Sequence, residues 1–598
     1  MADRFPLIID NSEEKIKELV SGDNLDLTKS NLKNADYIQS AGVNVAGVAT
    51  ATSLIGDGSQ LTNLPPSGGS LTATASGTLA DGSKVIVNAD GTVSAVTQVG
   101  SGWIAATLGG TSGESGYKVG VDSSGNVYVV GFTLSAGAGS RDLIVAKYNS
   151  SGTIQWQRTL GGSSIEYGND IVVDSSDNVY VCGYTNSSGA GNYDLLVAKY
   201  NSSGTIQWQR TIGGTGKDYG HGIDIDSSGN IYVTGGTTSV GSGNRSTLTM
   251  KLNSSGTPQW QRTLYGSSTT EFFAGMKIDS AGSSYVAGRT NSSGSYDIFI
   301  AKYNSSGTIQ WQRTLGGTGS DIGESITCDD QGNVYAVGHT SSVGAGSNDL
   351  IIAKYDSNGS VVWQRTLGGI ESDIGYGVTM DSSGNVYVAG STSSAGAGSA
   401  DVLIAKYNSS GTIQWQRTLG GTGSEIGYGI VVDGSGNLYV AGYTTSSGSG
   451  GDDLFIAKLS DDGSGTGTYG NFTYASSSLT DSSSSLTASA SSLTNASASL
   501  SDSSSSLTDT TSNLTSSVTS MVSSNLTSEN FIGISDAAYT NGQTATIQIM
   551  GAVDDAQSSL TPGQSYYVQG DGTLSETADS PSVFAGTAIA ATKLIVRG

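Results

Sequence analysis

An all-β fold built as a closed ring of seven sheets is predicted by three markers that recur in step along the chain. The seven tryptophans, in contexts such as GTIQWQRTLGG at 152–162, follow one another at intervals of 51 to 53 residues. Stretches similar to VDSSGNVYV and to DLLVAKYN each recur seven times at about the same interval. A β-rich, glycine-punctuated period of this length is the size of a four-stranded propeller blade. The sequence therefore predicts a seven-bladed β-propeller.

Each repeat contains four short strands separated by turns. Within residues 375–419, the strands GYGVTMD, NVYVAGS, DVLIAKY and TIQWQRTL are separated by turns such as SSG and NSSG. Valine, isoleucine, tyrosine and tryptophan favour the pleated strand, whereas glycine, serine and asparagine favour the turns. A helical repeat of similar length would instead place apolar residues at a period near 3.6.

The order of the strands predicts how the ring closes. The array begins with a lone strand of the tryptophan type, GWIAATLGG at 102–110, and ends with a strand of the third type, DLFIAKL at 453–459. Pairing of these segments would complete the seventh blade and leave no open sheet edge. The predicted propeller spans residues 101–462. Its repeats resemble the SBBP family of β-propeller repeats, and this resemblance implies a scaffold without naming a ligand.

Charge and composition exclude several classes of function. The net charge is −24 and only 13% of residues are charged, so the basic stripe typical of nucleic-acid binding is missing. Cys182 and Cys328 occupy non-equivalent positions in different repeats, which does not support a disulfide framework. The first twenty residues lack the apolar core of a secretory signal, and no segment reaches a membrane-spanning length. We expect no nucleic-acid partner, no signal peptide and no membrane insertion.

Neither catalysis nor a metal or other cofactor is predicted. His221 and His339 lie in different repeats and fit no zinc or triad spacing. The DSSGN turn is interpreted as a hairpin capped by aspartate, because a calcium loop would need more carboxylates. The WQR arginines and the Asp and Lys that frame each third strand are interpreted as scaffold ion pairs. Several acidic residues could serve in glycoside cleavage, but similar ones recur in every repeat: Glu166, Asp218, Glu324, Asp373 and Glu425.

The loops that vary between repeats are expected on one face of the ring, because connections in a four-stranded meander alternate between faces. Unusual side chains gather there in the third and fourth repeats. Aromatic rings beside carboxylate and guanidinium groups suit stacking on sugars and hydrogen bonding to hydroxyls. The alternative is that the phenylalanines pack between blades and the arginine is solvated. The predicted ligand-binding residues are Tyr219, His221, Arg245, Glu271, Phe272 and Phe273.

A serine- and threonine-rich segment with a seven-residue repeat follows the propeller. In a helix its regularly spaced leucines would form one seam, as in a coiled coil, so residues 463–527 are predicted to be a heptad stalk formed by several chains. The alternatives are a flexible linker and a fibrous β arrangement. The seam residues are Leu479, Leu486, Leu493, Leu500, Leu507, Leu514 and Met521. Small residues occupy the second seam position, at Ser483, Ala490, Ser497, Ser504 and Thr511.

The flanking segments resemble parts of phage structural proteins. Residues 528–598 contain alternating strands such as TATIQIMGAV and are predicted to form a small β domain, similar to C-terminal modules of tailed-phage proteins. Residues 67–100 are predicted to be a small β segment. Residues 1–66 are predicted to be an attachment segment; SGDNLDL and ATATSLIGDGSQLTNLPP resemble tail-fibre-like proteins of phages that infect marine cyanobacteria.

These resemblances imply a virion structural fibre protein. Such a protein would be a non-catalytic homotrimer, made in the host cytoplasm, joined to other virion proteins through its N-terminus and bound to a host-surface glycan during adsorption. The alternatives are a bacterial cell-surface adhesin and a glycan depolymerase tailspike.

Overall fold

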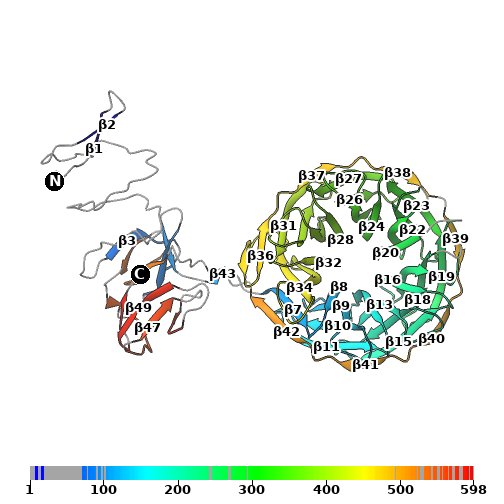
Figure 1. Cartoon of the computed structure of the whole chain (residues 1–598), viewed down its shortest axis with the longest axis horizontal. Helices are drawn as coiled ribbons and strands as arrows, with labels where there is room; N and C mark the ends of the chain where they lie inside the picture. The colour runs from blue at the N-terminus through cyan, green and yellow to red at the C-terminus, as the bar shows by residue number, and fades with distance from the viewer. Residues whose placement is uncertain are drawn as a thin grey trace.

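The computed structural model describes residues 103–520 apart from 242–244, 267–270, 292–293 and 492, together with parts of 7–18, 70–99 and 523–596. In these ranges every regular element is a β-strand, which confirms the all-β prediction. Seven sheets form a closed ring around a central channel (Figure 1). No helix in the described part of the chain is long and apolar enough to cross a membrane.

Each blade is an antiparallel meander that runs from the channel to the rim. In blade 1, β8 (Glu114–Val121) lines the channel and is followed outward by β9 (Val127–Thr133), β10 (Asp142–Tyr148) and β11 (Ile154–Gly161). The middle strands β9 and β10 are buried along almost their whole length, because neighbouring blades cover both faces of the sheet. Their apolar runs are therefore continuous and do not alternate with polar residues.

Blades 2 to 6 repeat this order. Their strands are β12 (Glu166–Val173), β13 (Val179–Thr185), β14 (Asp194–Tyr200) and β15 (Ile206–Gly213); β16 (Asp218–Ile225), β17 (Ile231–Thr237), β18 (Ser246–Leu252) and β19 (Pro258–Tyr265); β20 (Glu271–Ile278), β21 (Ser284–Thr290), β22 (Asp297–Tyr303) and β23 (Ile309–Gly316); β24 (Asp321–Cys328), β25 (Val334–Thr340), β26 (Asp349–Tyr355) and β27 (Val361–Gly368); β28 (Asp373–Met380), β29 (Val386–Thr392), β30 (Asp401–Tyr407) and β31 (Ile413–Gly420).

Blade 7 closes the ring with a strand from the start of the array, as predicted. It consists of β32 (Glu425–Val432), β33 (Asn437–Thr444), β34 (Asp453–Ser460) and β7 (Trp103–Gly109). β34 pairs antiparallel with β7, with Leu454 opposite Leu108 and Ala457 opposite Ala105. Ala105 and Leu108 are fully buried, so this junction is as well covered as the middle of a blade.

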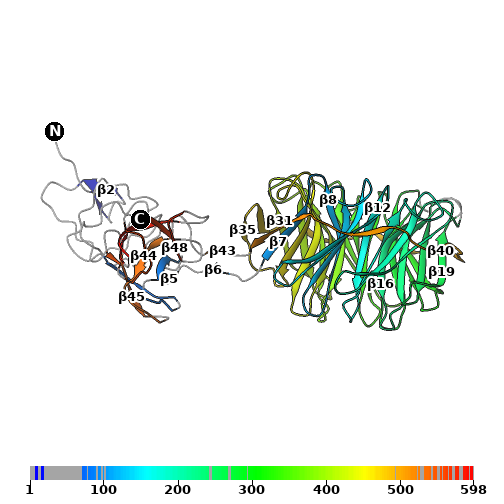
Figure 2. The ribbon, with the colours of Figure 1, turned by 90° about the horizontal axis from the view of Figure 1, so that it is seen from below.

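The predicted coiled-coil stalk is wrong, because the heptad segment forms a belt around the outside of the ring. We call residues 472–520 the belt. They form one short strand on the outer edge of each blade, and the strands lie along the rim in Figure 1 and at its waist in Figure 2. Visiting blades 6, 5, 4, 3, 2, 1 and 7 in turn, the strands are β36 (Phe472–Ser476), β37 (Thr480–Ser483), β38 (Thr487–Ala490), β39 (Thr494–Ser497), β40 (Ser501–Ser504), β41 (Thr508–Thr511) and β42 (Thr515–Ser520).

The seven-residue spacing matches one belt repeat to one blade. Four residues pair with the blade edge and three pass to the next blade, and an extended repeat spans at most about 23 Å. The six belt leucines from Leu479 to Leu514 are only 5 to 8% exposed and pack into the grooves between blades. The residues of the predicted second seam, such as Ala490 and Ser497, are instead exposed. The belt thus has one apolar contact per repeat, not a helical seam.

The WQR motif holds both the belt and the neighbouring blade. In blade 3, Gln261 donates a 3.1 Å hydrogen bond to the Leu500 carbonyl and accepts one from the Leu500 backbone N–H at 2.9 Å. Trp260 donates to the Ser305 carbonyl in blade 4, and Arg262 donates to the Gly307 carbonyl. The predicted ion pairs of the arginines are therefore replaced by hydrogen bonds to backbone carbonyls.

Gly307→Ala is expected to destabilise the ring, because this turn lies directly on the indole of Trp260. Gly307 has a φ of 74°, and a Cβ there would lie 2.8 Å from Trp260 Cδ2. We expect a loss of about 2 kcal/mol from the strained backbone and overpacking together. Gly434→Ala is the control, since a Cβ there meets no atom within 4 Å. Equal unfolding midpoints for the two variants in urea would contradict this account.

The segments on either side of the ring form one second module. Residues 67–100 and 528–598 are predicted from the sequence to be separate units, but β44 pairs with β4 and β45 pairs with β3. The first sheet contains β3 (Ser70–Thr74), β4 (Lys84–Val87), β5 (Val93–Ala95), β44 (Phe531–Ser535) and β45 (Thr544–Gln548). The other sheet contains β46 (Val553–Asp554), β47 (Ser565–Val568), β48 (Leu574–Ser575), β49 (Val583–Ala590) and β50 (Lys593–Val596).

The propeller is therefore an insertion between two parts of the second module. β6 (Gln98–Val99) pairs with β43 (Ser523–Ser524), so the chain enters and leaves the ring side by side. The two passages continue into β7 and β42, which also pair with each other. Of the predicted attachment segment 1–66, the described part is one hairpin of β1 (Leu7–Asp10) and β2 (Lys15–Glu18); the rest lies outside the described residues.

Candidate functional site

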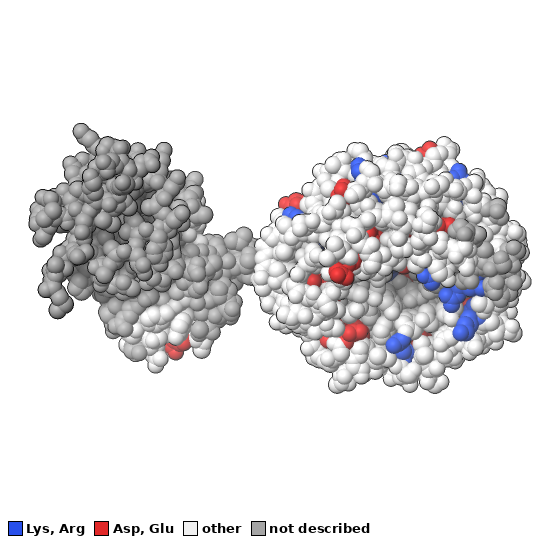
Figure 3. All heavy atoms as spheres, turned by 45° about the horizontal axis from the view of Figure 1, so that its top comes forward, with Lys and Arg blue, Asp and Glu red and all other residues white. Residues whose placement is uncertain are grey.

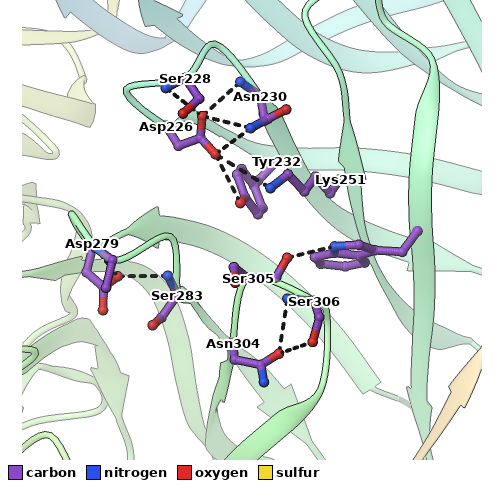
Figure 4. Close-up of polar contacts among 12 residues, drawn as sticks. Asp226, Ser228, Asn230, Tyr232, Lys251, Asp279, Ser283, Asn304, Ser305 and Ser306 are labelled. Atoms are coloured by element: carbon purple, nitrogen blue, oxygen red, sulfur yellow. Dashed lines mark hydrogen bonds and ion pairs between the residues drawn. The ribbon is translucent and has the colours of Figure 1, made fainter.

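The face that carries the DSSGN and NSSGT turns, here called the turn face, is held by repeated internal contacts. Asp226 accepts hydrogen bonds from the backbone N–H groups of Ser228 and Asn230, and from the Asn230 side chain and the Tyr232 hydroxyl (Figure 4). Lys251 lies 3.6 Å from the same carboxylate. These contacts hold the pKa of Asp226 below its usual value, against the raising effect of burial. The carboxylate is fully used by the turn, as the hairpin interpretation predicts.

The lysine near the end of each third strand lies over the tyrosine of the second strand, and in blades 1 and 3 it pairs with the aspartate of this turn and not with the aspartate at the start of its own strand. Lys147 lies 3.7 Å from Asp122 and 4.9 Å from the centre of the Tyr128 ring. Asp142, at the start of that strand, accepts instead from the backbone N–H groups of Ala138 and Gly139. The predicted Asp–Lys pairing within the third strand is therefore wrong, although both residues are structural.

The opposite face, here called the loop face, surrounds the mouth of the channel with side chains that differ from blade to blade. Each inner strand carries a β-bulge at its fourth residue, as between Gly116 and Lys118 in β8. A bulge leaves one residue out of the ladder and turns its side chain in a new direction. The glycine on the neighbouring strand permits the bulge, since a Cβ at Gly131 would lie 1.8 Å from the Ser115 carbonyl oxygen. The seven bulge residues are Tyr117, Asn169, His221, Ala274, Glu324, Tyr376 and Tyr428.

Aromatic rings form a continuous arc around more than half of the mouth. The arc, defined as Tyr376, Tyr428, Tyr117, Tyr167, Tyr184 and Tyr219, passes through blades 6, 7, 1, 2 and 3. Successive ring centres lie 4.8 to 6.3 Å apart, and each ring is half-buried. Burial raises the pKa of Tyr117 and of Tyr376 to about 12, so both hydroxyls stay protonated near neutral pH. Part of each tyrosine of the arc is exposed to solvent.

Cationic side chains lie against the same arc. The guanidinium of Arg141 lies 4.6 Å from the Tyr167 ring centre, and that of Arg245 lies 4.9 Å from Tyr219. Arg245 fills the space above Gly236, where blades 1, 2 and 7 have an aromatic ring on the second strand. A guanidinium held over a ring loses less freedom when it binds a ligand than one that is free in solvent.

Glu324 is the one carboxylate among the seven bulge residues. Burial raises its pKa to about 7, against the lowering effects of Arg289 and Lys118. Burial also disfavours the charged form of the two histidines of this face. Together with neighbouring arginines, it lowers the pKa of His221 to about 3 and the pKa of His339 to about 4. Near neutral pH the histidines are uncharged, whereas Glu324 changes its charge.

The other four carboxylates named as possible groups for glycoside cleavage make structural contacts. Glu166 accepts from the Thr185 hydroxyl and from the Gly162 backbone N–H, and it is fully buried. Asp218, Asp373 and Glu425 occupy the same position at the start of their inner strands and are also fully buried. Their hydrogen bonds hold the loops of the blade, and their burial keeps them out of reach of a ligand.

The structure brings together three of the six predicted ligand-binding residues. Tyr219 and His221 stack with ring centres 6.0 Å apart, and Arg245 lies over Tyr219. Glu271, Phe272 and Phe273 begin β20 in the next blade, and their side chains lie outside the described residues. Sequence reasoning missed the rest of the arc. For three of its rings, Tyr117, Tyr376 and Tyr428, the signal was the fourth residue of the first strand, which differs from blade to blade.

Below the mouth the channel holds a cavity of about 210 Å³ with charged walls. Lys277 lies 3.0 Å from Asp224, Asp170 accepts from the Ile223 backbone N–H, and Lys118 donates to the Tyr428 carbonyl. These contacts link neighbouring inner strands. Across the described ranges, no three His, Cys, Asp or Glu side chains are grouped as metal ligands.

Comparison with known families matches the repeats of the propeller. The β-propeller repeat family SBBP matches residues 155–189, 207–241, 310–344, 362–396 and 414–448. A second β-propeller family, the domain of unknown function DUF5122, matches residues 332–361 and 382–413. Each SBBP match runs from the tryptophan strand of one blade into the loop after the second strand of the next blade.

Two curated proteins are similar over part of the chain. The regulatory protein FlaEY of Caulobacter vibrioides is 26% identical over 215 residues, which cover 29% of this chain and 22% of that protein. The uncharacterized WD repeat-containing protein L264 of Acanthamoeba polyphaga mimivirus is 23% identical over 324 residues, which cover 50% of this chain and 21% of that protein. The chain thus spans about a fifth of the length of each relative.

Several solved structures are similar to this chain at low sequence identity. Sqt1 of Chaetomium thermophilum aligns at 8% identity with a TM-score of 0.33, over 58% of this chain and 96% of that one. The polysaccharide lyase Uly1 aligns at 11% identity with a TM-score of 0.36, over 66% of this chain and all of that one. The ring, its repeats and the family matches agree on one identification: the chain carries SBBP β-propeller repeats.

Proposed function

We propose that this chain is a virion fibre protein whose propeller binds a host-surface glycan at the channel mouth without cleaving it. The observation that carries the proposal is the aromatic arc, which places six tyrosine rings around one opening. Aromatic rings beside hydrogen-bonding groups are the usual means by which proteins hold sugar rings. The turn face, by contrast, uses its polar groups internally.

The fibre setting rests on the sequence resemblance of the flanks to phage structural proteins. In this setting the N-terminal segment binds other virion proteins, and the second module joins that segment to the ring. The proposed assembly is a homotrimer. That number rests on the resemblance alone, because the belt leucines are buried against the chain's own ring.

Tyr167→Ala is expected to lower glycan binding by about tenfold, the effect of losing one stacking contact and its hydroxyl. Tyr167 is central to the arc, since its ring lies 4.8 Å from Tyr184 and 6.3 Å from Tyr117. The measurement is binding of the full chain to an array of surface polysaccharides, with the thermal midpoint as a check on folding. Tyr539→Ala, a half-buried ring of the second module, is the control. Equal array signals for both variants and the parent would exclude the mouth as the site.

One side chain, Glu324, favours a second candidate function, which is cleavage of the bound glycan. Glu324 has a pKa of about 7 in the mouth, which suits a general acid or base near neutral pH. Incubation of the chain with a polysaccharide that it binds separates the two functions. Shortened chains with the parent protein and intact chains with Glu324→Gln would favour cleavage, whereas intact chains with both proteins would favour binding alone.

A further inference from the structure

We infer that the glycan held at the mouth is anionic, and that its carboxylate or sulfate groups bind the cationic side of the mouth formed by blades 1 to 4. This inference rests on the proposed function and names the class of its ligand. Two observations support it. Six lysines and arginines of the ring lie outside the repeated motifs, and most of these six lie at the mouth.

Most cations of the ring belong to the repeated scaffold. Residues 103–460 contain nineteen Lys and Arg, of which seven are the lysines that end the third strands and six are the WQR arginines. The six that remain all fall between residues 118 and 289, in blades 1 to 4. They are Lys118, Arg141, Lys217, Arg245, Lys277 and Arg289. Cations outside the repeat are therefore confined to one half of the ring.

Four of the six cations lie at the mouth itself. Arg141 and Arg245 lie over the arc, Lys217 lies 5.6 Å from the Tyr193 ring centre, and Arg289 lies 4.9 Å from that of Tyr296. Figure 3 shows Lys and Arg side chains gathered on one side of the opening. Lys118 and Lys277 lie deeper and are used by the channel wall. The four at the mouth form a cationic side that borders the aromatic arc.

The chain as a whole is acidic. The chain has a net charge of −24, and the acidic side chains of the loop face lie on the other side of the opening in Figure 3. Glu371 and Asp452 lie in the loops that precede β28 and β34, in blades 6 and 7. A local cationic surface in an acidic protein directs an anionic ligand to one place and one orientation. A neutral glycan would not be directed by a cationic surface.

Glu324 makes the binding depend on pH. The groups that face it are Arg289 on β21, Lys118 on β8 and Tyr376 on β28, with His339 on the paired strand β25. His339 has a pKa of about 4 and stays neutral above pH 6. As the pH rises through 7, Glu324 gains a negative charge beside the cationic side. Affinity for a sulfated glycan, whose charge is constant in this range, is therefore expected to fall from pH 6 to pH 8, and Glu324→Gln is expected to remove the fall.

The test compares dextran sulfate and polygalacturonate with neutral dextran, by calorimetry on the full chain at two salt concentrations. The first two probes distinguish sulfate from carboxylate recognition, and dextran shares its backbone with the first. Arg141→Gln and Arg245→Gln are each expected to weaken anionic binding by about tenfold, the effect of losing one charge-assisted hydrogen bond. Lys199→Gln removes the same charge on the turn face, where Lys199 lies over Tyr180, and is the control.

Binding of either anionic probe that weakens with salt and with the two arginine changes, but not with Lys199→Gln, supports the inference. Binding of neutral dextran or neutral array glycans alone would overturn the anionic class and leave the proposed function standing. No binding of any glycan would overturn both. Equally tight binding of double-stranded DNA, unaffected by Tyr167→Ala, would show plain attraction of polyanions and would overturn the inference.

Discussion

Ala106→Pro is expected to open the ring and to cost at least about 3 kcal/mol of folding free energy. Ala106 lies in the middle of β7, opposite Ile456 of β34 on one side and Val518 of β42 on the other. Proline removes a ladder hydrogen bond and is not accepted in a central strand. β7 pairs with β34 of the last repeat on one side and with β42, the end of the belt, on the other. One substitution in β7 therefore affects both the closure of the ring and the attachment of the belt.

The measurement for this variant is the thermal midpoint together with the radius of gyration from X-ray scattering. Ala106→Gly is the matched control, since it removes one methyl group and keeps the backbone donor. We expect a lower midpoint and a larger radius for the proline variant and a small shift for glycine. A proline variant with the radius and midpoint of the parent would show that the ring does not depend on β7.

Replacement of the belt leucines is expected to release the belt. Leu486, Leu493 and Leu500 each pack into a separate groove between blades, against core residues such as Phe299. Each leucine-to-alanine change should cost about 2 kcal/mol, the lower end for a buried leucine, because each groove is partly open to solvent. The triple variant should therefore expose the belt to proteases while the ring stays folded. The measurement is limited proteolysis followed by mass spectrometry.

Adding leucines at other positions of the segment distinguishes a belt from a coiled coil. Ala490, Ser497 and Ser504 would lie on the second seam of a coiled coil, and leucine at those positions would strengthen it. In the belt they are exposed, so the same leucines should leave the unfolding midpoint unchanged. A rise in the midpoint and in the mass of the assembly would contradict the belt.

The ring could be predicted from the sequence because its markers are local and repeated. The strands, the turns and the pairing of the segments 102–110 and 453–459 all follow from the period and from the order of strand types. The belt could not be predicted, because a seven-residue spacing fits both a helical seam and one contact per blade. Two clues pointed to strands: the poor helix propensity of serine and threonine, and the equal number of belt leucines and WQR motifs.

The site could be predicted only in part. The varied loops and the unusual residues Tyr219, His221 and Arg245 directed attention to the loop face in blade 3, where the structure brings these three residues together. Three rings of the wider arc, Tyr117, Tyr376 and Tyr428, lie at bulges, and a bulge is not visible in a pattern of strand residues. The cationic side of the mouth can be recognised only after the lysines and arginines of the repeated motifs have been assigned to the scaffold.

Hydrogen–deuterium exchange of the full chain, with and without an anionic oligosaccharide, tests the channel-mouth account most directly. The account predicts slower exchange in the first halves of the inner strands, at 114–118, 166–170 and 218–222, and no change in the turns at 122–126 and 226–230. Slower exchange confined to the turn face or to the belt would place the ligand elsewhere and would contradict the account.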